Sequence, residues 1–502
     1  MLTLHLSIVV FMPLAAGLAG ALLPARFARW LVLAATIGVL GYAIAMLADF
    51  PRGDGGLHYV TDDEWIPELG VRYSLGVDGL NLFLIVLTAL LWVPSTLWAF
   101  VRERDRPRLF FFNLALAETA VLGAFVAQDL ALFVVFFDLM LVPFYFLIGG
   151  WGSGDRVRAT TKFVIYTLVG SLLMLAGAVA LGVLATPDGG EISFSLATLA
   201  KRPLAEGTQQ WIFVLFALAF LVKAPLFPLH GWVPETYRST PIPVLALLSA
   251  VLSKVGVYGF LRIVLPILPD AAEHFQDIVL VMAVFSILYG SALAFSQDEA
   301  RLVVAYSSIA QLGFITLGIF SLDDKGAQGA VMQMVNHGLV VAPLFFIIGL
   351  LAARAGGTDS LARLGGMALR APVLAALFLI VTLATLAMPG SPNFIGEILI
   401  LFGAFEDKFV YGLVASVGVV LAAVYMIRVF QRSMHNRLAE GVESRELCRL
   451  DLAAIAPVAA VVVALGLYPQ FVLDRTEEAT VSKVRAAAAV AGSSHLETSV
   501  IK

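Results

Sequence analysis

Five charged residues stand inside long apolar stretches of this sequence: Asp138, Lys223, Lys254, Glu397 and Glu118. A charge at the centre of a lipid bilayer costs roughly 2.5–3.5 kcal/mol on insertion scales, and such residues therefore need a compensating role. Buried lysines and carboxylates can exchange protons near neutral pH. If Asp138 and Lys223 lie close together, breaking and remaking their pair would capture or release a proton.

Two histidines, His230 and His337, also lie at or within apolar stretches. Histidine titrates close to physiological pH, which suits a proton relay. We expect both histidines to act with Lys254 and Glu397 in such a relay. The alternative is that the charged residues form static buried ion pairs and that the histidines are hydrogen-bonded packing groups. This alternative has most weight for Glu118, which is assigned only an auxiliary role as an acid.

The sequence has too few metal and sulfur ligands for redox chemistry of its own. It contains one cysteine, Cys448, and seven histidines. Iron–sulfur clusters require several thiolates, and a structural zinc site usually requires four closely spaced ligands. We therefore expect no metal site here, and any linked redox chemistry belongs to another chain or to a bound organic cofactor.

The elements that carry these residues are predicted to be membrane-spanning helices. The chain is 60% apolar and 14% charged, against about 45–50% and 25% in a soluble domain. Its apolar runs have twenty or so residues without dyad alternation, which excludes barrel strands. The first run is read as a retained span. The predicted fold is an all-α transmembrane bundle of about fourteen spans, at residues 4–24, 29–49, 79–101, 109–127, 130–150, 162–185, 209–230, 244–266, 276–296, 302–321, 329–353, 371–404, 409–431 and 452–472.

The basic residues are distributed very unevenly between alternate loops. One set of loops, with Arg29 at the edge of the first, holds 19 of the 32 lysine and arginine residues, whereas the other set holds six. The positive-inside rule then places the first set in the cytoplasm and both termini outside. The loops of the basic set are residues 25–28, 102–108, 151–162, 231–243, 297–301, 354–370 and 428–451.

Two of the predicted spans are interrupted by proline. One reads LVKAPLFPLHGW and the other reads LAMPGSPNFIGE. Proline removes a backbone donor and clashes with the preceding turn, which predicts a kink or an unwound segment in each helix. The two spans are five apart in order, which indicates inverted repeats with broken helices, as in many transporters. The alternative is that the prolines only serve packing.

This pattern divides the chain into four regions. They are an N-terminal three-helix region at 1–101, a first antiporter-like repeat of spans four to eight at 102–266, a second inverted repeat of spans nine to thirteen at 267–431, and a last span with a polar tail at 432–502. Residues 473–502 are predicted to be mobile. The segment DDEWIPELGVRYSLGVDGL is predicted to be a loop.

Several motifs resemble those of the antiporter-like M-type subunits of proton-pumping NADH–quinone oxidoreductase, respiratory complex I. They include QDLALFVVFFDLMLVPFYFLIGGWG, LVKAPLFPLHGWVPETYRSTP, LLSAVLSKVGVYGFLR, QMVNHGLVVAPLFFIIG and MPGSPNFIGEILILFGAF, in the expected order. The resemblance extends from about Trp65 to Pro469. The glutamate after the second break, Glu397, is similar to the M-type pattern and argues against the related L and N types.

The resemblance implies a function and a setting. Proton transfer would pass through Asp138, Lys223, Lys254 and Glu397, driven by an electrostatic push from neighbouring chains. This chain would be a subunit of the oxidoreductase without redox chemistry of its own, and NADH, FMN, iron–sulfur clusters and quinone would bind to partner subunits. Its partners would be L-type and N-type neighbours and lipids, with no nucleic acid, in the inner membrane of a bacterial cell.

This sequence departs from the family pattern at several positions. Asp138 stands where glutamate is usual, which shortens the acid by one methylene. The stretch PETYRSTPIP lacks a usual histidine, Ala300 replaces a usual lysine, and Gln311 stands where histidine is often found. The proton routes are therefore expected to differ from the family scheme.

Two other functions remain open from the sequence. The same helices could belong to a cation/proton antiporter or a membrane-bound hydrogenase complex, or they could form a structural subunit that has lost transport. Neighbouring genes for dehydrogenase and quinone-site subunits would favour the first function over these.

Overall fold

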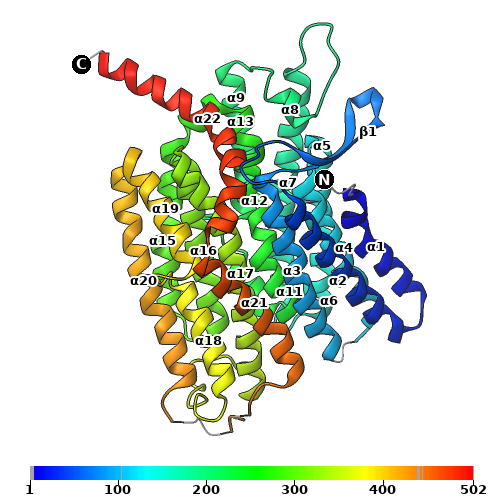
Figure 1. Ribbon diagram of the computed structural model, residues 1–502, viewed down its shortest axis with the longest axis vertical. Coiled ribbons are helices and arrows are strands. Elements are labelled where there is room, and N and C mark those ends of the chain that lie inside the picture. The colour runs from blue at the N-terminus through cyan, green and yellow to red at the C-terminus, as the bar shows by residue number, and fades with distance from the viewer. Residues whose placement is uncertain (1–4, 103–104, 438–440, 444, 501–502) are drawn as a thin grey trace.

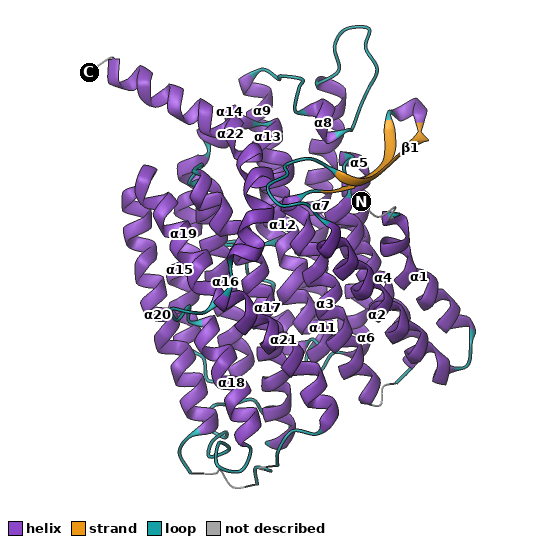
Figure 2. Ribbon diagram, in the orientation of Figure 1, coloured by secondary structure: helices purple, strands orange, loops and turns teal. Residues whose placement is uncertain are grey.

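The computed structural model describes residues 5–102, 105–437, 441–443 and 445–500. This part of the chain is a bundle of long helices with one small β-hairpin at its edge (Figures 1 and 2). The first half contains α1 (Leu6–Leu22), α2 (Ala25–Asp49), β1 (His58–Ile66), η1 (Pro67–Leu69), β2 (Val71–Val77), α3 (Gly79–Val101), α4 (Pro107–Val126), α5 (Leu130–Leu139), α6 (Leu141–Trp151), α7 (Arg156–Leu184), α8 (Leu196–Leu199), α9 (Glu206–Lys223) and α10 (Val233–Ser239).

The second half begins with a helix that contains two π turns. It runs through α11 (Ile242–Leu247), the π turn η2 (Leu248–Leu252), α12 (Ser253–Gly259), the π turn η3 (Phe260–Val264) and α13 (Leu265–Ile267). The remaining helices are α14 (Pro269–His274), α15 (Gln276–Ser296), α16 (Ala300–Phe320), α17 (Asp324–Arg354), α18 (Pro372–Thr385), α19 (Pro392–Asp407), α20 (Phe409–Met434), α21 (Arg449–Leu467) and α22 (Gln470–Val500).

Eleven helices in the described residues are long and apolar enough to cross a membrane. Each coincides with one of the predicted spans. The other three predicted spans correspond to α1, which has 17 residues, to α9, and to the pair α18 and α19. The polytopic helical fold is confirmed, whereas the count of about fourteen and the inverted repeats stay predictions.

Both predicted interruptions are present. Helix α9 ends at Lys223, and no α-helix resumes until Val233, with Pro225 and Pro228 in between. Helix α18 ends at Thr385, and α19 begins at Pro392. The prolines lie within or directly after these breaks, because a residue without an N–H and with a bulky ring interrupts a continuous helix.

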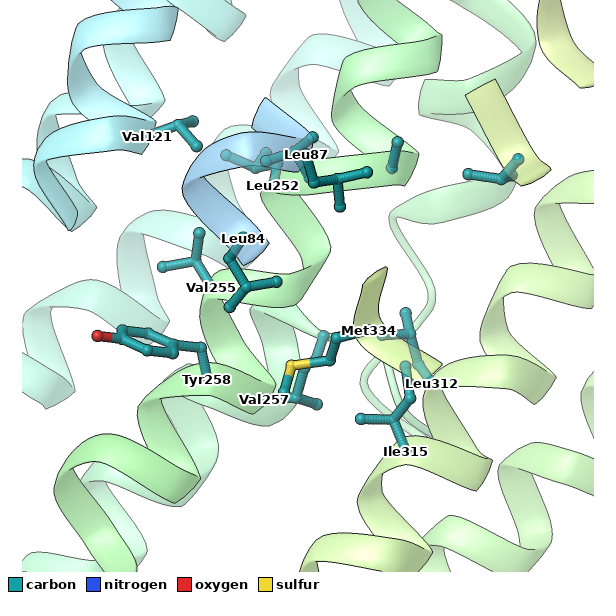
Figure 3. Packing of buried hydrophobic residues seen from close by; sticks show 14 of the residues in the cluster. Leu84, Leu87, Val121, Leu252, Val255, Val257, Tyr258, Leu312, Ile315 and Met334 are labelled. Carbon is teal, nitrogen blue, oxygen red and sulfur yellow. The ribbon is translucent and has the colours of Figure 1, made fainter. Parts of the chain in front are cut away.

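The centre of the bundle is formed by α17, α16, α3 and the helix at 242–267. Apolar side chains of these helices pack with side chains of α4 in the hydrophobic core (Figure 3). Burial in this low-dielectric interior strengthens the electrostatic interactions of polar groups inside it. The labelled core residues are Leu84, Leu87, Val121, Leu252, Val255, Val257, Tyr258, Leu312, Ile315 and Met334.

The predicted loop before α3 is in fact a hairpin. Strands β1 and β2 pair antiparallel, with Glu64 opposite Arg72. Gly70 connects them with a φ of 67°, in the left-handed region that glycine adopts without strain. The alternation of this segment was too irregular to indicate strands, because bulges interrupt the register at both ends.

The prediction of a mobile polar tail after residue 472 was also wrong. Helix α22 runs from Gln470 to Val500 and packs against α3, α13, α14 and α17. Thr476 and Thr480 are buried although they are polar, because each hydroxyl reaches a backbone carbonyl of the same helix. The polar composition of this segment therefore gave no sign in the sequence that one face of α22 packs on the bundle.

The basic loops gather at one end of the bundle. In Figure 1 the connections from α1 to α2, from α3 to α4 and from α20 to α21 lie at the lower end, opposite the hairpin. Arg104, which was counted among these basic residues, lies outside the described residues. The cytoplasmic placement of this end stays a prediction.

Candidate functional site

Lys254 lies at the centre of the bundle with its side chain completely buried. It belongs to α12, directly after the π turn at Leu248–Leu252. A π turn lengthens the hydrogen-bonding repeat of a helix and is often found at functional sites. Lys254 Nζ donates a hydrogen bond to the backbone oxygen of Ser249 at 2.7 Å, and to Ser253 Oγ at 3.3 Å.

The third partner of Lys254 is His337 of α17. Lys254 Nζ lies 2.6 Å from His337 Nδ1. Such a contact needs one proton between the two nitrogens, because two protonated groups would both donate. A proton on Lys254 can therefore pass directly to His337. The other ring nitrogen of His337, Nε2, is buried without a hydrogen-bond partner in the described chain.

Glu397 is held on one side by two glutamines. It lies in α19, in the second turn after the break, and is 3% exposed. Its Oε1 accepts a hydrogen bond from Gln311 Nε2 at 2.8 Å, and Gln311 Oε1 accepts one from Gln333 Nε2 at 2.6 Å. Among the described residues, Glu397 Oε2 has no partner.

We use the name polar line for two buried hydrogen-bonded groups that adjoin on α17. The first is Lys254 with His337, and the second is Gln333 with Gln311 and Glu397. Gln333 precedes His337 by four positions on α17, and the two side chains therefore share a face of that helix. Gln333 was not among the site residues predicted from the sequence. Its spacing from His337 was the signal that could have found it.

Asp138 and Lys223 lie near each other without forming an ion pair. The two groups attract each other electrostatically, but no bond within 4.0 Å joins them in the part of the chain described. Lys223 Nζ instead lies 4.5 Å from the centroid of the Phe137 ring. Asp138, near the end of α5, lies beside Ser171 of α7.

The end of α9 itself stabilises the Lys223 cation. Lys223 is the last residue of this helix, where the helix dipole is negative. The aromatic face of Phe137 adds a cation–π interaction. The cation thus has two weak partners that do not depend on the charge of Asp138.

His230 and Glu118 lie apart from both groups. The ring of His230 contacts Phe227 and Tyr289, and its Nδ1 has no hydrogen-bond partner within the described residues. Glu118 lies in α4 and is completely buried, and neither carboxylate oxygen has a partner in the described part of the chain. The structure does not join either residue to the line from Lys254 to Glu397.

A second buried charged cluster was missed in the sequence. Arg262 donates two hydrogen bonds to the carboxylate of Asp78, at 2.6 and 2.7 Å, and both side chains are 2% exposed. Arg262 Nε also donates to the hydroxyl of Tyr258 at 2.8 Å. The cluster ties the N-terminus of α3 to η3. Arg262 could have been found by its place inside a predicted span.

The sequence relatives of this chain point to one family. A family model described as NADH:quinone oxidoreductase/Mrp antiporter, TM matches residues 127–423, more than half of the chain. The chain belongs to this family. The family region contains Asp138, Lys223, Lys254, His337 and Glu397, whereas Glu118 lies before it.

Two relatives in the family align with this chain along almost their whole length. The NADH-quinone oxidoreductase subunit M of Rhodobacter capsulatus is 35% identical over 485 residues, which cover 93% of this chain and 94% of the relative. The subunit M of Mycobacterium tuberculosis strain H37Rv is 36% identical over 512 residues, which cover 93% of this chain and 92% of that protein.

Solved structures share the fold of this chain. A chain of respiratory complex I from Thermus thermophilus with bound NADH matches with a TM-score of 0.88 and 31% identity, over 96% of this chain and all of that one. A chain of the Mrp complex from Dietzia sp. DQ12-45-1b matches with a TM-score of 0.83 over 97% of this chain and 99% of that one. The latter is 22% identical, and its likeness shows the fold alone.

Proposed function

We propose that this chain is a proton-translocating membrane-arm subunit of a bacterial NADH–quinone oxidoreductase. The redox reactions take place in other subunits, which bind NADH, FMN, iron–sulfur clusters and quinone. The two subunit M relatives, which align along almost the whole chain, support this assignment. The neighbours in the complex are L-type and N-type subunits and lipids, and both termini lie on the outer side of the membrane.

The observation that carries the proton-transfer role is the contact between Lys254 and His337. When an N–H bond of Lys254 breaks, an Nδ1–H bond forms on His337, and the proton on Nε2 is released to the next acceptor. Glu397, whose Oε2 has no partner among the described residues, is the final acceptor of this proton. Charge is conserved at each step, and no redox partner is needed within this chain.

Asp138 and Lys223 control the proton transfer from Lys254 to His337. In the structure the Lys223 cation is held by a helix end and an aromatic ring. A change of charge in a neighbouring subunit that draws Asp138 closer to Lys223 would strengthen their attraction and shift the Lys223 cation, and the reverse change would return the cation to its present place. This coupling acts through low-dielectric protein, where charges interact strongly over several ångströms.

The direct test is Glu397→Gln in the assembled complex, with proton uptake measured per NADH oxidised in sealed vesicles. The neutral amide cannot take up the proton, and we expect the yield through this subunit to be lost while the complex assembles. Glu406→Gln is the matched control, because Glu406 lies on the same helix and forms an exposed pair with Lys325. An unchanged proton yield in Glu397→Gln would overturn the assignment of the relay.

The second candidate is a subunit of a cation/proton antiporter or a membrane-bound hydrogenase complex. The family model is shared between oxidoreductase and Mrp antiporter subunits, which keeps this candidate open. The two functions differ in their dependence on substrate. Proton transport driven by NADH oxidation supports the oxidoreductase, whereas exchange driven by a sodium gradient without NADH supports the antiporter.

A further inference from the structure

The contact between α17 and α19 is unusually close and unusually polar. A Cβ atom placed on Gly329 would lie 2.6 Å from the backbone nitrogen of Ile400, and one placed on Gly396 would lie 2.3 Å from Gln333 Oε1. Gly329 therefore requires glycine, because backbone lies in the way, whereas a Cβ at position 396 would displace the amide end of Gln333. The backbone of the residue before Glu397 thus lies directly against the side chain of Gln333.

Unpaired polar atoms concentrate along this contact. They come from α17 and from the first two turns of α19, and all belong to buried side chains. Buried polar atoms in folded proteins are nearly always hydrogen-bonded, and internal water is their usual partner where protein atoms do not reach. The atoms without a protein partner in the described chain are His337 Nε2, Gln333 Oε1, Asn336 Oδ1, Glu397 Oε2 and both amide atoms of Asn393.

The hydrogen bonds from Gln333 to Gln311 and from Gln311 to Glu397 all donate toward the carboxylate. An ionised carboxylate only accepts hydrogen bonds, and the NH₂ group of Gln311 must therefore face it. The carbonyl of Gln311 then faces Gln333, which donates in turn at 2.6 Å. The carbonyl of Gln333 is left pointing to Gly396, at the contact between α17 and α19.

An amide can hold a carboxylate but cannot relay its proton. Its NH₂ group is a donor without a free lone pair, and it does not titrate near neutral pH. Proton delivery through Gln311 to Oε1 is therefore blocked. The remaining oxygen of Glu397, Oε2, has no partner among the described residues, and neither has His337 Nε2, which releases the proton in the proposed relay. The two residues belong to α19 and α17, the helices that form this contact.

We infer that Gln311 and Gln333 are positioning residues that tie down Oε1 of Glu397 and thereby present Oε2 to the polar contact between α17 and α19, where the proton from His337 arrives. The inference rests on the proposed function. Gln311, which departs from the common histidine, thus changes a titratable position into a fixed hydrogen-bond donor. Gln333 fixes the orientation of Gln311 from the neighbouring helix.

The test uses Gln333→Leu and Gln311→Leu in the assembled complex. Gln311→Leu removes the hydrogen bond to Glu397, and Gln333→Leu removes the hydrogen bond that orients Gln311. Because hydrogen bonds to charged groups are strong, we expect the rate of proton transfer to fall about tenfold in each variant. The carboxyl stretching band of Glu397, assigned in infrared spectra by its loss in Glu397→Gln, should shift in both variants. A merely structural role would leave that band in place.

Two further variants make the test specific. Gln276→Leu removes a buried glutamine of the same fold that donates to the backbone of Phe320 at 2.8 Å, and it should leave the band and the proton yield unchanged. Gln311→His keeps a donor beside Glu397 and should restore most of the rate lost in Gln311→Leu.

The outcomes separate this inference from the proposed function. If Glu397→Gln abolishes proton transfer but the two leucine variants leave both rate and band unchanged, the positioning role is overturned and the relay stands. If Glu397→Gln has no effect on proton yield, the relay itself fails. Loss of the rate with an unmoved band would also overturn the inference, because Glu397 would then not be held by the glutamines.

Discussion

The two groups of buried charges in this protein are held in opposite ways. Lys254 is fixed by three hydrogen-bonding partners, one of them the titratable His337. Lys223 is held by a helix end and the face of Phe137. A cation with directional partners can pass a proton on, whereas a cation with diffuse partners can shift its position in response to a distant charge. The first arrangement suits transfer and the second suits control.

The strongest challenge to this contrast is Lys254→Met. The variant removes the donor to His337, while the carbonyl of Ser249 keeps its hydrogen bond from Ser253 Oγ. We expect proton transfer to fall at least about a hundredfold. Proton uptake per NADH in sealed vesicles measures this loss. Lys325→Met is the control, because Lys325 forms an exposed pair with Glu406 and exposed pairs contribute little. If transfer survives in Lys254→Met, transfer and control are not divided as described.

A smaller effect is expected from Asp138→Asn. This variant removes the charge that attracts Lys223 but breaks no ion pair within contact distance. We expect about a tenfold fall in the proton yield with normal assembly, because control is lost while the relay stays intact. Asp188→Asn, in an exposed loop, serves as the control. Normal pumping in Asp138→Asn would make Asp138 a structural residue and would turn attention to Glu118.

The smallest effect is expected from Phe137→Leu. The loss of a cation–π interaction is worth about 0.5–2 kcal/mol, and we expect a change of about threefold in the steady-state rate of proton transfer. Phe133→Leu is the matched control, since Phe133 packs on Phe137 and Phe220 one turn away. Equal effects of the two substitutions would show that the ring acts on Lys223 only through packing.

The broken helices and the individual buried charges could be predicted because their signals are local. Proline at 225 and 389 forbids a regular helix whatever surrounds it, and a charge at 254 or 397 is costly in lipid in any fold. The contacts of these charges could be predicted only in part. His337 was expected to share a relay with Lys254, but nothing in the sequence indicated that the two side chains, 83 residues apart, are in direct contact.

Polar residues without charge were the hardest to interpret. Gln333 stands in an apolar helix at no unusual cost, and only its contact with Gln311 gives it a role. Arg262 and Asp78 lie 184 residues apart in the sequence and neutralise each other's charge in the core. The face of α22 that packs on the bundle was hidden in a similar way, since threonines there satisfy their hydroxyls within the helix.

The glycines at 329 and 396 have a mechanical consequence. Two helices whose backbones are already in contact cannot move closer together, and their interface has no free space for a larger side chain. A proton step at the contact between α17 and α19 therefore cannot use a closer approach of the two helices, and rotation of side-chain bonds is the movement left for it in that direction. Side-chain rotations are much faster than movements of whole helices.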